Sequence, residues 1–303
     1  MAVVATYSTP SSVAYRPPAT SRQGNLTGSD GKQVSSLCLT ALKQLKRLNL
    51  SSTRLPLGFS DKGLVHLAAF PDLDSLHLAG ESLSDEALVH IGRCTNLERL
   101  GLNFGSFTDA GMAETRKLTK LKWIRISSRH LTEAGLLHLG ALSRLEFAEL
   151  RTDGATDRVL EILSGINSLA RLDLYANSRS GFAQSRPPFT AAGMAHFKGH
   201  PGLRTLWLTN ANIDAGLLAT LKTLTQLDEL TLMMPGLSDD EVRGLQAALP
   251  MARVSAAWGG HGIAPLQRSG DLKRRGAGGV RRDLIPARSV ASGDLTEWSV
   301  PGN

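Results

Sequence analysis

A six-residue pattern of leucines, L-x-x-L-x-L, recurs through the middle of the chain and limits the folds open to it. Successive copies start 28, 24, 24, 24, 24, 34 and 24 residues apart. One such coil cannot bury its own apolar stripe, so copies in a common register must stack on one another. The sequence therefore predicts a solenoid. The copies begin at Leu45, Leu73, Leu97, Leu121, Leu145, Leu169, Leu203 and Leu227.

The hydrophobic period changes halfway through each copy. In residues 97–120, the alternation of Leu100 and Leu102 predicts a strand with both leucines facing the core, and the spacing of Phe107 and Met112 indicates a helix. A Ser or Thr followed by an acid marks each helix start, because the hydroxyl caps free N–H groups and the acid suits the positive end of the dipole. These pairs are Ser60-Asp61, Ser84-Asp85, Thr108-Asp109, Thr132-Glu133, Thr156-Asp157 and Ser238-Asp239.

This pattern resembles the leucine-rich repeat family over about residues 36–258. It is similar to the bacterial 24-residue type, in which helices open with a motif such as T-D-A-G-L, matched here at residues 108–112 and 132–136. The resemblance implies an α/β solenoid with a parallel β-sheet on the concave face and short helices on the convex face. It implies no particular partner, because one fold carries many functions.

The sequence departs from that family at the ninth position of the repeat. Many members hold Asn there, and it ties neighbouring turns together through backbone hydrogen bonds. Most of that ladder is missing here, so we expect less uniform turns between strand and helix. The residues at this position are Thr53, Glu81, Gly105, Arg129, Asp153, Asn177, Ala211 and Pro235.

The two ends of the chain differ in composition from the repeats. Residues 1–32 are rich in Ser, Thr and Pro, so we expect a disordered leader, favoured over an organelle transit peptide of shared composition. No secretory signal is recognised there, which favours a cytoplasmic location. Residues 259–303 lack periodicity and are expected to form a disordered basic tail. The solenoid, about eight repeats with partial ends, is expected over residues 33–258.

The net charge of +7 lies mainly in the ends, since residues 1–35, 36–258 and 259–303 contribute +2, +2 and +3. A scaffold this close to neutrality implies no broad positive face and argues against nucleic-acid binding by the repeats, although it leaves room for a local basic cluster. A cluster of basic residues in the tail could bind nucleic acid or acidic partners or act in nuclear import, although such runs are usually solvated charge. No segment resembles a membrane span. The cluster comprises Lys273, Arg274, Arg275, Arg281 and Arg282.

The two cysteines form no disulfide framework. Cys94 occupies a position where other repeats carry Leu, Ile or Phe, so we expect it to fill a core slot as a small hydrophobe. Cys38 lies in a half-repeat that has the helix portion of a coil but no strand before it. Free cysteines of this kind favour a reducing compartment.

A column of histidines is the most tempting catalytic feature. His66, His90 and His138 share one repeat position, with Glu114 between them, and His with Glu is a plausible zinc set. Helices packed about 8–10 Å apart nevertheless hold such side chains too far apart to share one ion. We therefore expect no metal, no cofactor, no catalytic residue and no small-molecule substrate, and a metal-dependent hydrolase is the least favoured function.

Large side chains gather on the exposed face of the predicted sheet. Residues that flank the inward leucines form columns that run across the strands, and neighbouring members of a column lie about 4.8 Å apart. At the centre of the first column stand Arg, Trp, Phe and Arg. The candidate partner-binding residues are Arg99, Trp123, Arg125, Phe147, Glu149, Arg151, Arg171, Asp173, Tyr175 and Trp207.

Two interpretations of these columns are compatible. In one, the side chains cover each other: Arg99 and Arg171 flank the two central aromatic rings, and Arg125 pairs with Glu149. In the other, Trp, Tyr and Arg form a binding hot spot, and exposed aromatic patches mark interaction surfaces. The sequence therefore favours a protein–protein interaction module without enzymatic activity. The alternative is a substrate-recognition or regulatory subunit of a larger complex, similar to a ligase receptor.

Two insertions and the two ends add further expectations. Extra residues near Leu55–Gly58 and within Ser178–Pro188 fall between strand and helix, where they either form a recognition edge or are tolerated loops. The first strand, near Leu45, and the ninth, near Met251, lack recognisable caps. The uncapped ends predict a homodimer, docking of a tail or derivation from a longer array.

Overall fold

The structure is a computed structural model, which describes residues 24–25, 45–51, 61–81, 83–152, 154–175, 189–209, 213–233, 237–258 and 261–262. All of them belong to the first of the two units of the chain, Met1–Leu266. Among the helices in these ranges, none has the length and apolar character that crossing a membrane requires.

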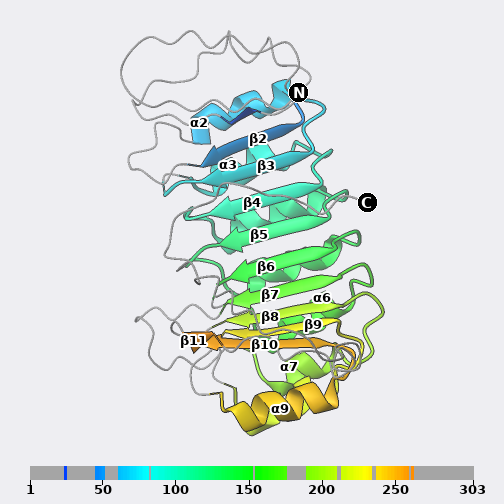
Figure 1. The fold of residues 1–303 in the computed structure, drawn as a ribbon. Helices are drawn as coiled ribbons and strands as arrows, with labels where there is room; N and C mark the ends of the chain where they lie inside the picture. The colour runs from blue at the N-terminus through cyan, green and yellow to red at the C-terminus, as the bar shows by residue number, and fades with distance from the viewer. Residues whose placement is uncertain are drawn as a thin grey trace, which may run out of the picture. The chain divides into compact units, whose positions relative to one another are not determined.

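The described strands form one sheet in which each strand neighbours the next along the chain (Figure 1). Every pairing from β1 to β10 is parallel, and only the last, β10 with β11, is antiparallel. The repeat leucines are in register, as in the pairing of Leu76 with Leu100. The strands are β1 (Gly24–Asn25), β2 (Arg47–Ser51), β3 (Ser75–Ala79), β4 (Arg99–Asn103), β5 (Trp123–Ser127), β6 (Phe147–Arg151), β7 (Arg171–Tyr175), β8 (Thr205–Thr209), β9 (Glu229–Met233), β10 (Arg253–Trp258) and β11 (His261–Gly262).

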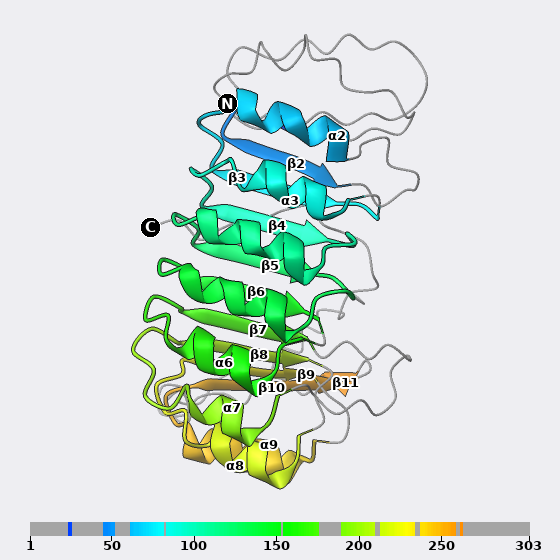
Figure 2. The same ribbon diagram turned by 180° about the vertical axis from the view of Figure 1, so that it is seen from behind.

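Short helices cover one side of this sheet (Figure 2). Each follows its strand and returns the chain to the start of the next, so the predicted leucine-rich-repeat solenoid is confirmed. The helices are α2 (Asp61–Leu64), η1 (Val65–Ala69), α3 (Asp85–Ile91), α4 (Asp109–Met112), η2 (Ala113–Lys117), α5 (Glu133–Leu136), η3 (Leu137–Ala141), α6 (Asp157–Ser164), α7 (Ala191–Ala195), α8 (Ala215–Leu221) and α9 (Asp239–Ala248), where η denotes a 3₁₀ helix.

The core lies between the sheet and the helices. Apart from Leu50, which is partly buried, the leucines of the repeat pattern are buried there with almost no exposed surface, and burying such a side chain contributes about 1.5–3 kcal/mol. Cys94 is buried among them, as its repeat position predicted, and burial raises the pKa of its thiol to about 11. Cys38 lies outside the described residues.

Only some of the expected hydroxyl caps form at the helix starts. Ser84, Thr132 and Ser238 cap their own helices as expected, whereas Thr108 and Thr156 make no such side-chain bond, and Ser60 lies outside the described residues.

The acid of every motif except the last, Ser238-Asp239, accepts a hydrogen bond from the Ser or Thr that precedes the next helix. Thr108 donates its backbone N–H and its hydroxyl to Asp85 over 2.8 and 2.6 Å, and Thr132 does the same to Asp109 over 2.9 and 2.6 Å. Two bonds to one carboxylate hold neighbouring helix starts at a fixed separation. Further pairs of this ladder join Ser84 to Asp61, Thr156 to Glu133 and Thr190 to Asp157.

The glycine of the motif permits this close approach, and it carries a stability prediction. A Cβ on Gly135 would lie 2.9 Å from Cα of Asp109, whereas a Cβ on the equivalent Gly63 of the first repeat meets no described atom within 4 Å. Gly135→Ala is therefore expected to destabilise the protein by about 1–3 kcal/mol through overpacking. Gly63→Ala should instead stabilise it by up to about 1 kcal/mol. Chemical denaturation of both variants checks this, and equal effects would contradict the ladder.

Short strands pair with the end strands of the solenoid. Gly24–Asn25 pairs with β2, and His261–Gly262 pairs with β10, each over two residues. Both short strands lie within the segments that the composition predicted to be disordered. Both insertions lie outside the described residues, as do five of the eight ninth positions, so the uniformity of the turns stays a prediction.

Candidate interaction surface on the open sheet face

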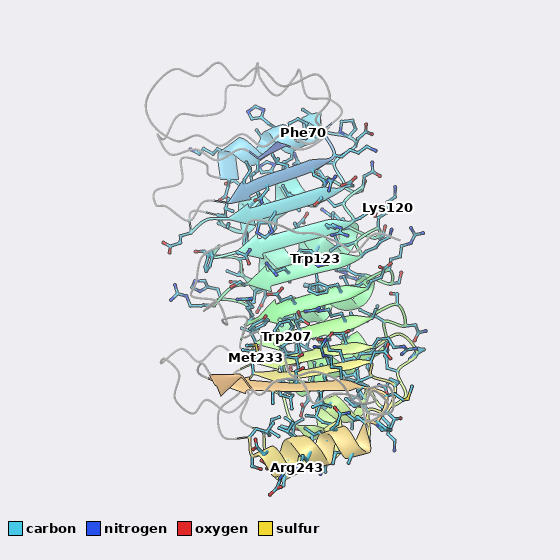
Figure 3. The ribbon with its side chains drawn as sticks, in the orientation of Figure 1. Phe70, Lys120, Trp123, Trp207, Met233 and Arg243 are labelled. Atoms are coloured by element: carbon cyan, nitrogen blue, oxygen red, sulfur yellow. The ribbon has the colours of Figure 1, made fainter. Side chains whose placement is uncertain are left out.

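The side of the sheet away from the helices is the face predicted to be concave, and we call it the open face. It consists of the first, third and fifth residues of β2 to β9. Strand pairing places Trp123 opposite Phe147, and Phe147 opposite Arg171, so the predicted columns are confirmed. Figure 3 shows Trp123 and Trp207 on this face, with Arg243 on α9 away from it.

Aromatic rings and guanidinium groups alternate across the centre of the open face. The rings of Trp123 and Phe147 stack with centroids 5.1 Å apart and planes 7° from parallel. Arg125 lies over Trp123 at 5.5 Å, and Arg171 lies over Phe147 at 5.4 Å and over Trp207 at 5.2 Å. Arg171 therefore flanks Phe147 as predicted, while Arg125 lies over Trp123, the ring that Arg99 was expected to flank.

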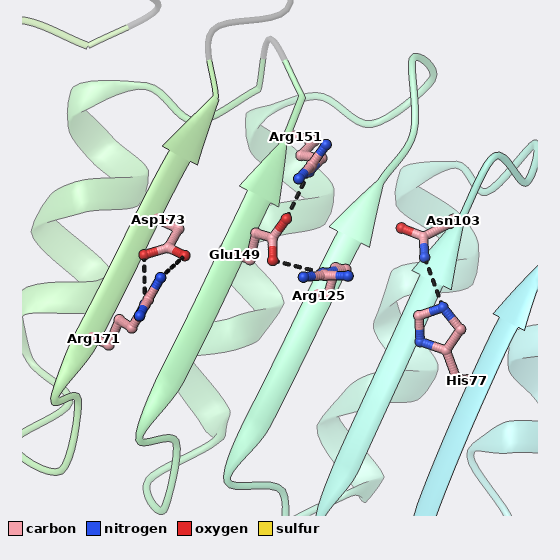
Figure 4. Close-up of polar contacts among 7 residues, drawn as sticks. All are labelled: His77, Asn103, Arg125, Glu149, Arg151, Arg171 and Asp173. Atoms are coloured by element: carbon pink, nitrogen blue, oxygen red, sulfur yellow. Dashed lines mark hydrogen bonds and ion pairs between the residues drawn. The ribbon is translucent and has the colours of Figure 1, made fainter. Parts of the chain in front are cut away.

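Two buried carboxylates hold these guanidinium groups in place (Figure 4). Glu149 is 1% exposed and accepts 2.6 Å bonds from Nε of Arg125 and from Nε of Arg151. Asp173 is 2% exposed and accepts two bonds of 2.9 Å from Arg171. The predicted pairing of Arg125 with Glu149 is thus confirmed, and most of the ten candidate residues form one connected cluster.

The remaining members join the cluster at its edges. The guanidinium carbon of Arg151 lies 4.0 Å from the ring centroid of Tyr175, so one arginine links Glu149 to an aromatic ring. Arg99 stands beside Trp123 in the strand pairing and is exposed. We call the ten residues the Arg-aromatic cluster.

Burial changes the acidity of the cluster. Desolvation raises the pKa of Asp173 above its ordinary value, while the hydrogen bonds and charge of Arg171 act in the opposite direction. Desolvation also raises the pKa of Tyr175, against the charge of Arg151. The ionised form of Asp173 therefore depends on its arginine partner, because a buried carboxylate without one costs several kcal/mol.

A histidine lies next to the cluster on β3. The ring of His77 covers Gly101, where a Cβ would come within 2.1 Å of Nδ1, and its Nε2 lies 2.9 Å from the side-chain nitrogen of Asn103. The pKa of His77 is lowered to about 4, chiefly by desolvation on burial and also by the charge of Arg125, against the opposing charge of Glu149. His77 is therefore neutral in the folded protein at neutral pH.

This neutral histidine predicts a loss of stability in acid. Because the folded pKa of His77 is below the ordinary 6.5, its contribution is present above pH 6.5 and is lost as the pH falls toward about 4. The full shift corresponds to about 3–4 kcal/mol. Urea denaturation between pH 7 and pH 4.5 should show His77→Gln losing less stability than the wild type. Parallel losses in both proteins would contradict the assignment.

Phe104 is a further aromatic residue that the sequence analysis missed. It follows the last residue of β4 and is 70% exposed, with φ at +60°. Its N–H donates to the carbonyl of Ser127, and Gly105 beside it packs on the ring of Phe107. Left-handed conformations of bulky residues are costly and gather at functional positions. A signal was present in the sequence, because the equivalent positions hold Gly80, Ser128 and Thr152.

The histidine column lies on the helices. His66, His90 and His138 lie on η1, α3 and η3, and Glu114 forms a 2.6 Å ion pair with Lys117. Across the described residues, no group of three or more His, Cys, Asp and Glu side chains could hold a metal ion.

Comparisons with known proteins add little to this geometry. No protein-family model and no curated protein matches the sequence. An internalin from Listeria monocytogenes is similar at 14% identity and a TM-score of 0.43, over 75% of this chain and 63% of its own. A chain in the structure of a TLR13–ssRNA13 complex is similar at 19% identity and a TM-score of 0.45, over 73% of this chain and 37% of its own. This chain thus spans less than two thirds of either, and the fold assignment rests on its own strand order and register.

Proposed function

We propose that the protein is a non-enzymatic interaction module that binds a protein partner through the Arg-aromatic cluster of the open face. The observation that carries the proposal is the run of alternating guanidinium groups and aromatic rings from Arg125 to Trp207. Trp, Tyr and Arg dominate the binding energy of protein interfaces. The cluster brings these residue types together at the centre of the sheet.

The cluster is also ordered before any partner arrives. Trp123 and Phe147 are half-buried against each other, and buried carboxylates fix the guanidinium groups of Arg125, Arg151 and Arg171. Immobilising a long side chain at an interface costs about 0.5–1.5 kcal/mol. A pre-ordered surface avoids much of that cost. This supports a binding role over an arrangement in which the side chains only cover each other.

We also infer that the repeats are of the bacterial 24-residue type. The ladder of acids and hydroxyls supports this inference, because Asp85 and Asp109 bind residues 23 positions further along the chain. The partners of these acids therefore recur with a period of 24 residues. The glycine of the T-D-A-G-L motif supports it too, since it admits the acid of the preceding repeat.

Affinity purification with matched variants tests the binding proposal. Ser127→Trp places a bulky ring on the open face at the end of β5, opposite Arg151, and Lys120→Trp places the same ring on an exposed connection away from that face (Figure 3). A protein recovered with the wild type and with Lys120→Trp should be depleted with Ser127→Trp. Equal recovery with all three would refute binding through the open face.

A further inference from the structure

The charges of the Arg-aromatic cluster are arranged in depth. The side chains of Glu149 and Asp173 are 2% and 3% exposed, whereas those of Arg151 and Arg171 are 40% and 35% exposed. The carboxylates thus lie beneath the guanidinium groups. Anything that approaches the open face meets positive charge first, and the interior carboxylates screen it only partly.

Arg151 has donors to spare for a ligand. Its bond to Glu149 uses Nε, and its guanidinium plane lies against Tyr175. Across the described residues, no hydrogen bond of its two terminal amino groups is found. A guanidinium held in this way presents a pre-oriented pair of donors, which match the oxygens of a carboxylate.

A stacked pair of aromatic rings lies on the same face of the sheet as this donor pair. Trp123 and Phe147 lie on the two neighbouring strands, β5 and β6, and their rings stack nearly parallel. Arg151 is four residues after Phe147, so both side chains lie on the same side of β6. Because Phe147 and Arg151 stand at opposite ends of β6, about 13 Å apart along the strand, a ligand that bridges both features needs an acidic group and an apolar or aromatic group separated by up to about that distance.

We propose that the partner binds the open face through an acidic peptide segment, with one carboxylate on the amino groups of Arg151 and an aromatic or large apolar side chain on Trp123 and Phe147. This inference rests on the function proposed above and specifies its chemistry. The exposed Arg99 adds a second positive group beside Trp123 for a neighbouring acid.

The same cluster favours a peptide over a nucleic acid. Three guanidinium groups face two carboxylates, which leaves a single excess positive charge among these five groups. Nucleic-acid binding gains its affinity from many phosphate contacts along a basic track, and base stacking alone is only part of it. An acidic segment of one or two charges matches this surface better.

Selection from a phage library of random twelve-residue peptides tests the proposal. Peptides enriched on the wild-type protein should contain at least one acidic residue close to an aromatic residue. Arg151→Gln should weaken their synthetic copies at least ten-fold, and Arg116→Gln on η2 should leave them unchanged. Replacing the acids of the peptides by their amides should cost a similar factor.

Other results would overturn it. Enriched peptides without acids, an absence of enrichment, or affinities unaffected by Arg151→Gln would each reject the acidic segment. Tighter binding of single-stranded oligonucleotides than of any selected peptide would favour nucleic acid instead. A protein partner that is lost with Ser127→Trp but unaffected by Arg151→Gln and by salt would leave the proposed function standing and the acidic segment rejected.

Discussion

Replacing Trp123 and Phe147 together with alanine is expected to weaken binding of a protein partner by roughly 1,000-fold. The two rings form the stacked centre of the open face, with guanidinium groups of Arg125 and Arg171 against them. A hot-spot residue contributes about 2 kcal/mol or more, and each factor of ten corresponds to about 1.4 kcal/mol. Titration calorimetry with a partner identified by affinity purification measures the loss.

The matched control for this variant is Arg116→Ala. Arg116 is an exposed residue of η2, on the side of the sheet opposite to Trp123. Its loss should leave the affinity within a factor of two or so, because an isolated exposed charge contributes little. Circular dichroism of the double variant separates loss of binding from loss of folding. Retained binding in the folded double variant, with loss in Arg116→Ala, would place the interface on the helices.

Arg171→Met is expected to reduce the free energy of unfolding by about 3–5 kcal/mol at neutral pH. The substitution leaves Asp173 buried without the two hydrogen bonds that Arg171 donates to it. Breaking a buried ion pair from one side costs this much, because the remaining charge stays desolvated. Urea denaturation of the variant and of the wild type measures the difference.

A second variant and a change of pH identify the cause. Arg171→Met combined with Asp173→Leu removes both charges and should recover most of the lost stability. The pKa of Asp173 is raised in the folded protein, so protonation of this carboxyl favours folding. The free-energy cost of burying its ionised form therefore grows as the pH rises through the pKa of the folded state. Arg171→Met should therefore be less destabilised at pH 4.5 than at pH 7.5. A double variant as unstable as the single one would show that packing of Arg171, and not its charge, is responsible.

The strand register and the columns of the open face could be predicted from the sequence because the leucines determine both. Leu100 and Leu102 must face the core, so residues 99, 101 and 103 face the other way. The constant interval between copies then aligns each strand with the next, as in the pairing of Trp123 with Phe147. Cys94 followed from the same argument, since its position in the repeat is apolar.

Side-chain contacts within the columns could not be predicted in the same way. Register places both Arg99 and Arg125 near Trp123, and side-chain conformations decide that Arg125 lies over the ring. The ladder from Asp85 to Thr108 was missed because a hydroxyl can cap its own helix or bind the preceding repeat, and Thr108 does the second. The conformation of Phe104 depends on a turn for which the leucine pattern carries no information.

The expectations for the two ends of the chain, its location and its oligomeric state stay predictions. These are the boundaries near residues 32 and 259, the cytoplasmic location and the homodimer. The pairing of Gly24–Asn25 with β2 shows that one end strand has a neighbour over two residues. Light scattering of the purified chain addresses the homodimer directly.

Hydroxyl-radical footprinting of the protein, free and bound to its partner, tests the central claim most directly. Trp123, Tyr175 and Trp207 are reactive aromatic residues of the open face, and His66 is an exposed residue on η1. Binding through the Arg-aromatic cluster predicts that oxidation of the three aromatic residues falls several-fold in the complex while oxidation of His66 is unchanged. Protection of His66 with unchanged oxidation of Trp123, Tyr175 and Trp207 would contradict it.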